Sequence, residues 1–301
     1  MDVDLKFIDL HIHTNKSDGT FNVDDIVNFA IQNKTKIIAI ADHDTIDGMN
    51  ELQKYLKDDM YGINGVEFSS YIKCNGSYIR IHILGYGFNK DDTGLIRLLQ
   101  IQKQKRLTAH LNLLKFLKED LKCIPEERIS KLDLERYCWF DREVIRCMQE
   151  ENYSVDVIGY YKDFFRKNRF SYGSDYDLEA KVVIEAIKAA GGYSIFAHPM
   201  DYKLERLIVD LIIAKLISLG IDGIEVYQSD CSIEDSNYLM NIVQQNKLLY
   251  SVGSDFHRMI NTDGRMIGRG INDNLCITET SLTDKLLKKK LYFKGNFKED
   301  K

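Results

Sequence analysis

The sequence lacks the features that define several large classes of protein. No apolar run approaches the roughly 18–20 residues that a membrane-spanning helix needs. The opening residues, MDVDLKFIDL, carry no basic segment followed by a long apolar stretch, so we expect neither a secretory signal nor a membrane anchor. The six cysteines are scattered and form no CxxC pair, which favours reduced thiols in a cytoplasmic protein.

The chain also lacks an excess of positive charge. Its net charge of −5 argues against a broad nucleic-acid-binding face, although a local basic pocket stays possible. Internal repeats and low-complexity segments are missing too, and 44% hydrophobic with 29% charged residues is ordinary for a globular protein. The lysine-rich residues 285–301 are interpreted as a solvated terminal helix or tail.

What is present is an alternation of strand and helix patterns at both ends of the chain. Asn22 is expected to cap a helix whose first turn carries Asp24 and Asp25. An Asn75-Gly76 turn is expected to join two strands as a hairpin. The predicted strands are residues 5–13, 36–41, 61–69, 78–86, 193–197, 223–227 and 248–252, and the predicted helices between them are 22–33, 46–57, 178–190, 204–219 and 233–245.

The alternation stops in the middle of the chain. Residues 95–119 carry apolar residues at helical spacing, and weaker helical patterns follow at 125–131, 133–150 and 155–166. We therefore predict a helical insertion over 91–169 within a domain formed by 1–90 and 170–301. Seven strands, most of them followed by a helix, favour an α/β barrel over an open sheet.

Six of the seven histidines lie in five short segments at or inside strand-like runs. His11 and His13 are two residues apart on a predicted strand, so both side chains point to the same face. Histidines at the ends of parallel strands converge when those strands close into a barrel. The segments are Asp9-Leu10-His11-Ile12-His13, Ala41-Asp42-His43-Asp44-Thr45, His82-Ile83-Leu84-Gly85, Ala197-His198-Pro199 and Gly253-Ser254-Asp255-Phe256-His257.

Carboxylates accompany these histidines. Asp18 is interpreted either as a ligand or as part of an Asp-Gly turn. Glu67 ends a strand and needs a positive partner if buried, and Asp255 repeats the two-residue spacing with His257. Asp44 is expected to cap the next helix or to support a ligand rather than to bind a metal itself. Neutral imidazoles with carboxylates are the ligands of Zn, Mn and Fe, and a cluster of this size indicates hydrolysis on more than one metal ion.

The motifs HIHT, SDG, ADHDT, GVE, HILGY, AHP and GSDFH together resemble the PHP (polymerase and histidinol phosphatase) family. The resemblance covers roughly residues 5–90 and 178–270. It is strongest to the branch that acts on nucleoside 3′,5′-bisphosphates and on the 5′ ends of short RNA. This resemblance implies a distorted (β/α)7 barrel, with an inserted helical subdomain, around a trinuclear site that accepts Mn, Fe or Zn.

The resemblance also implies a ligand set. It assigns one ion to His11, His13, Glu67 and Asp255, a second to Glu67, His82 and His198, and a third to Asp18, His43 and His257. A metal-bound hydroxide close to Glu67, Asp255 and His198 would attack phosphorus. The seventh histidine, His110, has no such context and is expected to be structural or exposed.

The insertion departs from the branch pattern. Related proteins carry an Arg-x-His segment there, whereas this chain has Arg142 and Arg146 without the histidine, and Asp141 stands at the position of the first arginine. Arg146 matches the later arginine, and a solvated helix face stays open as the alternative. The predicted substrate-binding residues are Arg106, Arg142, Arg146, Lys167 and Arg169.

The predicted function is hydrolysis of a phosphomonoester, on a nucleoside 3′,5′-bisphosphate or a short oligonucleotide. Histidinol-phosphate phosphatase is the alternative enzyme, and a metal-stabilised binding module is the alternative without catalysis. The expected partner is a small phosphorylated substrate, with neither a membrane nor a stable protein partner.

Overall fold

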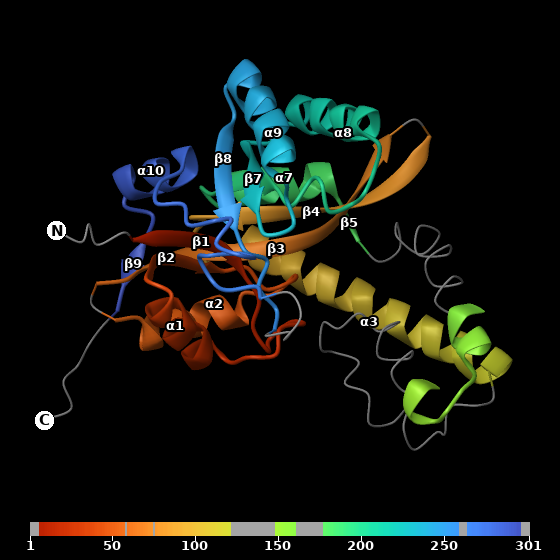
Figure 1. Ribbon diagram of the computed structural model, residues 1–301. Helices are drawn as coiled ribbons and strands as arrows, with labels where there is room; N and C mark the ends of the chain where they lie inside the picture. Colours follow the sequence, from red (N-terminus) through yellow and green to blue (C-terminus); the bar gives the residue numbers. More distant parts are fainter. Residues whose placement is uncertain are drawn as a thin grey trace, which may run out of the picture.

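The computed structural model describes residues 6–57, 59–74, 76–121, 148–160, 177–258 and 264–295, without the side chains of 112–121. A central sheet separates two groups of helices, with α1 and α2 on one side and α7, α8 and α9 on the other (Figure 1). The fold is therefore mixed α/β, as predicted. No helix within these described ranges is both long enough and apolar enough to cross a bilayer.

Seven strands follow one another through the sheet in the order β1-β2-β3-β4-β6-β7-β8. The two ends of this path meet, because Ile12 and Phe256 form a parallel bridge and the Asp255 backbone N–H donates to His11 O at 2.8 Å. The strands on the path are β1 (Phe7–Ile12), β2 (Thr35–Ile40), β3 (Tyr61–Cys74), β4 (Ser77–Tyr86), β6 (Tyr193–Phe196), β7 (Gly223–Gln228) and β8 (Leu249–Gly253).

Strand direction departs from the expectation at one place. β3 and β4 pair antiparallel down to Cys74 and Ser77, which confirms the predicted hairpin. β4 also runs antiparallel to β6, so the parallel arrangement assumed for the histidine-bearing strands is wrong for β4. His82 lies in the middle of β4 and pairs with Ser69 of β3.

The helices that flank the sheet bury an apolar face against it. In α1 the Asn22 side chain accepts from the Asp25 backbone N–H at 2.9 Å, which confirms the predicted cap. The helix buries Val23, Ile26 and Ala30. These helices are α1 (Val23–Gln32), α2 (Asp47–Tyr55), α7 (Ala180–Ala189), α8 (Arg206–Ser218) and α9 (Ile233–Asn246).

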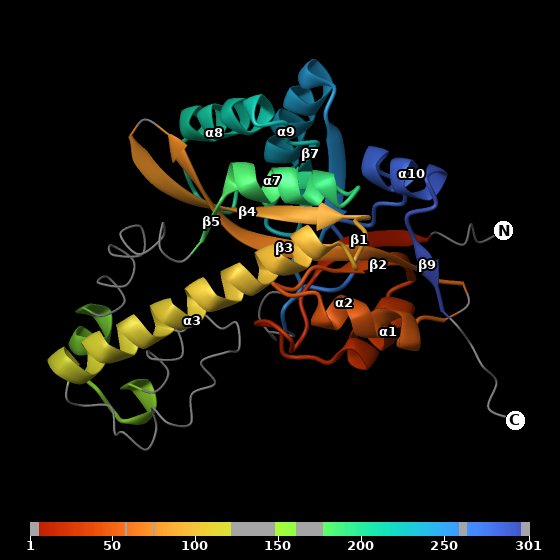
Figure 2. The same cartoon turned by 180° about the vertical axis from the view of Figure 1, so that it is seen from behind.

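The region predicted as an insertion begins with one long helix, α3 (Thr93–Leu121), which extends away from the sheet (Figure 2). Residues 148–150 and 155–160 are also helical. The rest of the weaker helices predicted between 125 and 166 lies outside the described residues, so the division into two domains stays a prediction.

The C-terminal segment is more ordered than a tail. Helix α10 (Ser281–Lys288) starts with a capping box at Thr280 and buries Leu282 and Leu286, while its lysines stay exposed. Strand β9 (Phe293–Lys294) then pairs antiparallel with β3. The sequence analysis expected a solvated helix or tail in this segment. A helix is present as α10, whereas a free tail is wrong for residues 293–294, which form β9. A further short strand, β5 (Leu178–Glu179), pairs parallel with β3.

Candidate metal centre

Two histidines from the first strand open the site. His11 lies on β1 and His13 directly follows it, and both side chains are fully buried. Their rings lie 5.0 Å apart, so the two-residue spacing does place them on one face. The parallel bridge between β1 and the segment after β8 brings Asp255 and His257 to the same place.

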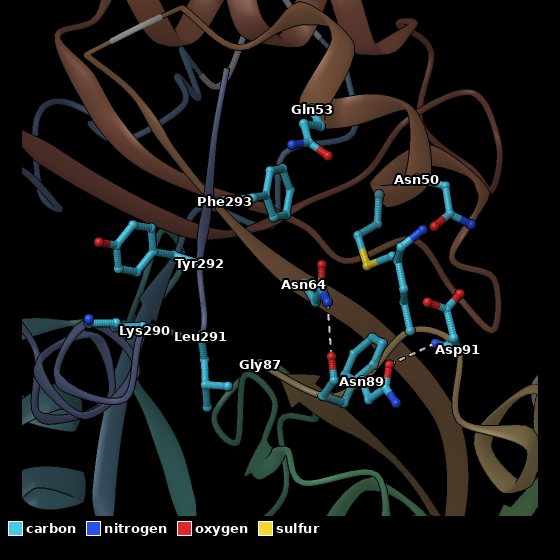
Figure 3. A pocket seen from close by; sticks show the side chains of 13 residues that line it. Asn50, Gln53, Asn64, Gly87, Asn89, Asp91, Lys290, Leu291, Tyr292 and Phe293 are labelled. Carbon is cyan, nitrogen blue, oxygen red and sulfur yellow. Dashed lines mark hydrogen bonds between the residues drawn. The ribbon is translucent and has the colours of Figure 1, made fainter. Parts of the chain in front are cut away.

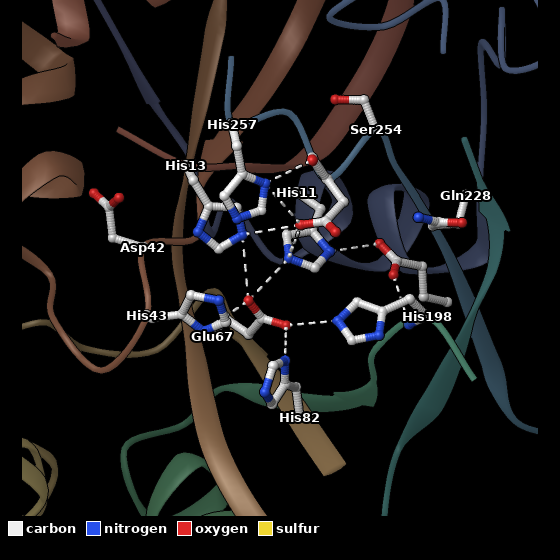
Figure 4. Close-up of polar contacts among 12 residues, drawn as sticks. His11, His13, Asp42, His43, Glu67, His82, His198, Gln228, Ser254 and His257 are labelled. Carbon is white, nitrogen blue, oxygen red and sulfur yellow. Dashed lines mark hydrogen bonds and ion pairs between the residues drawn. The ribbon is translucent and has the colours of Figure 1, made fainter. Parts of the chain in front are cut away.

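Glu67 lies at the centre of the cluster, fully buried on β3 (Figure 4). Its two carboxylate oxygens face different histidines. Glu67 Oε2 lies 3.2 Å from His11 Nε2, 3.2 Å from His13 Nε2 and 3.0 Å from His43 Nδ1, whereas Oε1 lies 2.9 Å from both His82 Nδ1 and His198 Nε2.

Asp18 and Asp255 complete the set from two loops. Asp255 Oδ1 lies 3.4 Å from His11 Nε2 and 3.1 Å from His13 Nε2. Asp18 Oδ1 lies 3.2 Å from His257 Nε2 and 3.5 Å from His13 Nδ1, and its Oδ2 is 3.8 Å from His43 Nε2. The structure thus brings together all nine residues that the sequence analysis named as ligands.

These side chains form three overlapping groups whose ligand atoms lie within 4.8 Å of one another. The group His11, His13, Glu67 and Asp255 is the same as the first ligand set taken from the resemblance. The group His13, Asp18, His43 and His257 is the same as the third set with His13 added. The third group holds His43 beside Glu67 and His82, while His198 shares Glu67 Oε1 with His82. The groups are His11, His13, Glu67 and Asp255; His13, Asp18, His43 and His257; and His43, Glu67 and His82.

The cluster fits metal ions because its buried atoms are not satisfied by the protein. His11 Nε2, both ring nitrogens of His13 and Glu67 Oε2 are buried and make no hydrogen bond with the residues that the structure describes. His11 Nε2 and His13 Nε2 each lie 3.2 Å from Glu67 Oε2, and His13 Nδ1 lies 3.5 Å from Asp18 Oδ1. Ligands at about 2.0–2.2 Å from an ion lie about 3 Å from each other, so these spacings suit a shared cation.

Burial and charge act on the same groups in opposite directions. Burial disfavours protonation of His13, but Asp255 and Glu67 outweigh it and raise its pKa to about 10. Burial lowers the pKa of His82 to about 4 and holds that of His43 well below its usual value. Burial alone would raise the pKa of Glu67, yet the surrounding imidazoles hold it well below its usual range. The lowered pKa of His43 and His82 favours neutral imidazoles beside the ionised Glu67, which is the state that binds a metal.

The sequence analysis missed Glu225, which is fully buried on β7. Its Oε1 lies 3.0 Å from His11 Nδ1, and its Oε2 accepts from the His198 backbone N–H at 2.8 Å. A carboxylate on the far ring nitrogen orients an imidazole for metal binding. The signal was a lone acidic residue inside the apolar run Gly223–Gln228.

The carboxylates beside His43 hold the backbone around the site. Asp42 accepts from the Thr14 backbone N–H at 2.7 Å and from Ser17 Oγ at 2.6 Å, which holds the turn before Asp18. Asp44 does not cap α2, since Ile46 is the N-cap and no side chain caps there. Asp44 Oδ1 accepts from the Ser69 backbone N–H at 2.8 Å, which supports the alternative that it positions a ligand.

Of the predicted substrate-binding cations, only Arg106 lies within the described residues. It is buried on α3, where it forms an ion pair with Asp44. His110, one turn further along α3, is buried, in agreement with a structural role. Arg142, Arg146, Lys167 and Arg169 lie outside the described residues.

A second polar hollow lies beyond the C-terminal end of β4 and shares no residue with the metal centre (Figure 3). It is bordered by α2, by the turn after β4 and by the segment that leads into β9. Its lining includes Asn50, Gln53, Asn64, Asn89 and Phe293, with no histidine and with Asp91 as its one carboxylate.

Comparison with known proteins assigns the chain to a family. The model of the PHP domain matches residues 9–190, which is more than half of the chain. The chain therefore belongs to the PHP domain family.

Characterised relatives cover most of the chain. A 5′-3′ exoribonuclease of Haemophilus influenzae is 28% identical over 84% of this chain and 90% of that protein. A phosphoribosyl 1,2-cyclic phosphate 1,2-diphosphodiesterase of Eggerthella lenta is 27% identical over 83% of this chain and 93% of that protein. A 3′,5′-nucleoside bisphosphate phosphatase of Chromobacterium violaceum is 23% identical over 83% of this chain and 87% of that protein.

The fold has a counterpart among solved structures. An amidohydrolase from Chromobacterium violaceum superimposes with a TM-score of 0.70 at 21% identity, over 95% of this chain and 97% of that one. At this identity the likeness concerns the fold alone.

Proposed function

We propose that this protein is a metal-dependent phosphoesterase. The observation that carries the proposal is the buried cluster around Glu67, in which five imidazole nitrogens lie within 3.2 Å of one carboxylate. Apolar packing gains nothing from such a cluster, whereas a group of divalent ions requires it. The three relatives described above are all named as enzymes that cleave phosphate esters.

We place the cluster at the mouth of a distorted (β/α)7 barrel. The contact between β1 and the segment after β8 supports closure of the sheet path. Up to three ions of Mn, Fe or Zn would be held. His11, His13, Glu67 and Asp255 bind the first, Glu67, His82 and His198 the second, and Asp18, His43 and His257 the third.

The chemistry follows from the charges in the site. Divalent ions lower the pKa of bound water to about 7 and neutralise the oxygens of a phosphoryl group. Asp18, Glu67 and Asp255 offset only part of the charge of three such ions, so a dianionic phosphomonoester is favoured. Glu67, Asp255 and His198 would lie beside the attacking water, and in-line attack on phosphorus would follow.

For the substrate we favour a nucleoside 3′,5′-bisphosphate or a short oligonucleotide. Support comes from the relatives of Haemophilus influenzae and Chromobacterium violaceum, which are named for such substrates. Histidinol phosphate finds no counterpart among these relatives. A non-catalytic metal-binding module is less favoured, because none of the nine ligand types is missing from the chain.

We place the enzyme in the cytoplasm, with a barrel domain of residues 1–90 and 170–301 and a helical cap of 91–169. The three described cysteines, Cys74, Cys231 and Cys276, are free thiols, which agrees with a reducing compartment. The departure of α3 from the sheet agrees with a separate cap.

A substrate screen tests the proposal. Purified protein with added Mn is incubated with nucleoside bisphosphates, 5′-phosphorylated oligonucleotides, histidinol phosphate and an aryl phosphate, and released phosphate or nucleotide is measured. Turnover is expected on the first two, with weaker activity on the aryl phosphate. Metal-dependent turnover of histidinol phosphate alone would show that histidinol phosphate is the substrate. No turnover of any phosphate ester would favour the metal-binding module without catalysis.

Arg146 offers a sharper test of the distal phosphate contact. Arg146→Ala is expected to raise KM for a nucleoside bisphosphate by the equivalent of about 1.5–3 kcal/mol, the range for a hydrogen bond to a charged group. An aryl phosphate has no second phosphate, so its KM should stay close to that of the wild type. Equal losses on both substrates would assign Arg146 to a structural role, and no loss on either would return it to a solvated helix face.

A further inference from the structure

A buried ion pair joins the long helix α3 to the loop that carries His43. Arg106 Nη2 donates to Asp44 Oδ2, and the two residues are only 8% and 4% exposed. Arg106 lies near the middle of α3, whereas Asp44 is the residue directly after His43. The first helix of the predicted cap is thus tied to a segment that supplies a candidate metal ligand.

Asp44 is itself held in an uncommon conformation against β3. Its φ is +54°, in the left-handed region that few residues other than glycine adopt and in which Asp is enriched. Its backbone N–H donates to Glu67 O at 2.8 Å, and the Glu67 N–H donates to Asp42 O at 3.2 Å. The segment around His43 therefore pairs with β3 at the position of the central carboxylate.

The Asp44 side chain extends this pairing and links it to the helix. Its Oδ1 accepts from the Ser69 backbone N–H at 2.8 Å, two residues beyond Glu67, while its Oδ2 accepts from Arg106. One carboxylate therefore bridges β3 and α3. This bridge leaves His43 Nδ1 3.0 Å from Glu67 Oε2 and His43 Nε2 3.8 Å from Asp18 Oδ2.

The charges of Arg106 and Asp44 neutralise each other in a buried environment. A buried charge that loses its partner is strongly disfavoured, so removal of Arg106 would leave Asp44 as an uncompensated carboxylate. Asp44 would then be drawn toward water or toward cations in the metal centre. Either movement displaces the adjacent His43, because the Asp44 N–H and Oδ1 hold this segment against Glu67 and Ser69 of β3.

We propose that Arg106 is a positioning residue, which sets His43 for metal binding through Asp44 and so couples α3 to the occupancy of the group His13, Asp18, His43 and His257. This role rests on the proposed metal-dependent function, but it differs from the direct substrate contact predicted for Arg106 from the sequence. It makes α3 a determinant of metal affinity.

The test compares metal binding in full-length variants without substrate. Arg106→Met removes the charge and keeps much of the side-chain volume, and Arg106→Lys restores a charge without the planar fork. Arg97→Met is the matched control, because Arg97 is exposed on the same helix. Protein is dialysed against a series of free Mn concentrations, and bound Mn per chain is measured by elemental analysis.

Arg106→Met is expected to weaken the lowest-affinity Mn site about 10-fold or more, the range seen when a residue that orients a metal ligand is removed. Arg106→Lys should recover part of this loss, and Arg97→Met should bind Mn like the wild type. The Mn concentration for half-maximal turnover should rise by a similar factor on an aryl phosphate and on a nucleoside bisphosphate.

Unchanged Mn binding in folded Arg106→Met would overturn the proposal. So would a KM increase restricted to the bisphosphate, which would assign Arg106 to substrate. Should Arg106→Met fail to fold, Asp44→Asn gives the same test, since the amide oxygen still accepts from Ser69 and only the ion pair is lost. A wild type that binds Mn but hydrolyses no phosphate ester would refute the proposed function and leave this binding test intact.

Discussion

The metal centre and the hollow beyond β4 are both polar regions on the same sheet, but they satisfy their polar atoms differently. In the hollow, Asn64 Nδ2 donates to Phe88 O at 2.9 Å, Asn89 Oδ1 accepts from the Asp91 N–H at 3.1 Å, and Asn50 and Gln53 are exposed to water. In the metal centre, buried atoms of His11, His13 and Glu67 face one another without a hydrogen bond within the described structure. Polar composition alone does not define a site; buried groups that need an external partner do.

The largest difference between the two regions is expected in catalysis. His198→Ala and Asp255→Ala should each lower kcat by orders of magnitude, because each removes a metal ligand without emptying the apolar core. Gln53→Ala in the hollow should leave kcat unchanged. The measurement is aryl phosphatase turnover at limiting Mn, with circular dichroism to check folding. Wild-type turnover in either ligand variant would show that the ligand assignment is wrong.

Metal removal should lower the thermal stability of the protein, and this loss should depend on the metal centre and not on the hollow. Saturation of the cluster at about 100 times Kd adds about 2.7 kcal/mol to the free energy of unfolding, so chelation should lower Tm. Glu67→Gln should abolish this metal-dependent shift, because the Glu67 carboxylate lies beside every histidine of the metal centre except His257. Gln53→Ala should keep it in full. Differential scanning fluorimetry with and without chelator measures the shift, and a chelator-insensitive wild type would contradict the prediction.

Glu225 gives a smaller effect within the metal centre. Glu225→Gln should weaken metal affinity about 10–100-fold, because it loses the charged partner that orients His11. Glu185→Gln is the control, since Glu185 is exposed on α7. Competition of bound Mn with a chelator of known affinity measures the change. Equal affinities in the two variants would reduce Glu225 to a packing role.

The smallest effect is expected in the hollow. Asn64→Ala loses the hydrogen bond to Phe88 O and should reduce the free energy of unfolding by about 0.5–1.5 kcal/mol, without a change in metal affinity. Urea unfolding with Mn present measures the stability. Asn50→Ala serves as the control, because Asn50 lines the same hollow and is exposed (Figure 3). A loss of Mn affinity in Asn64→Ala would show that the two regions are coupled.

Much of the fold followed from local patterns. The Asn22 cap, the alternation of strands and helices on both sides of α3, and the hairpin of β3 and β4 depend on neighbours in sequence, so they were predictable. The antiparallel pairing of β4 with β6, and that of β9 with β3, depend on strands far apart in the chain. Periodicity reports which face a strand buries but not which strand lies beside it.

The candidate metal site was likewise predicted only in part. His11 and His13 were recognised because a spacing of two residues puts both on one face, and Asp255 because it follows an apolar strand. Glu67 was recognised as a carboxylate in an apolar run, but β3 continues to Cys74, so the expectation that Glu67 ends its strand is wrong. Glu225 and the Arg106–Asp44 pair were not recognised in these roles. Each joins residues that are distant in sequence, and neither has a local spacing that marks it.

The sequence by itself determined the kinds of ligand atoms and placed most of their residues on or just after strands, because both follow from residue type and the two-residue period of a strand. Only the tertiary structure decided that one carboxylate, Glu67, meets five histidines, that Glu225 orients His11, and that Arg106 of α3 neutralises Asp44. The physical reason is that a buried charge must be matched by a partner within a few ångströms, and these partners are far apart in the sequence, so only the folded chain brings them together.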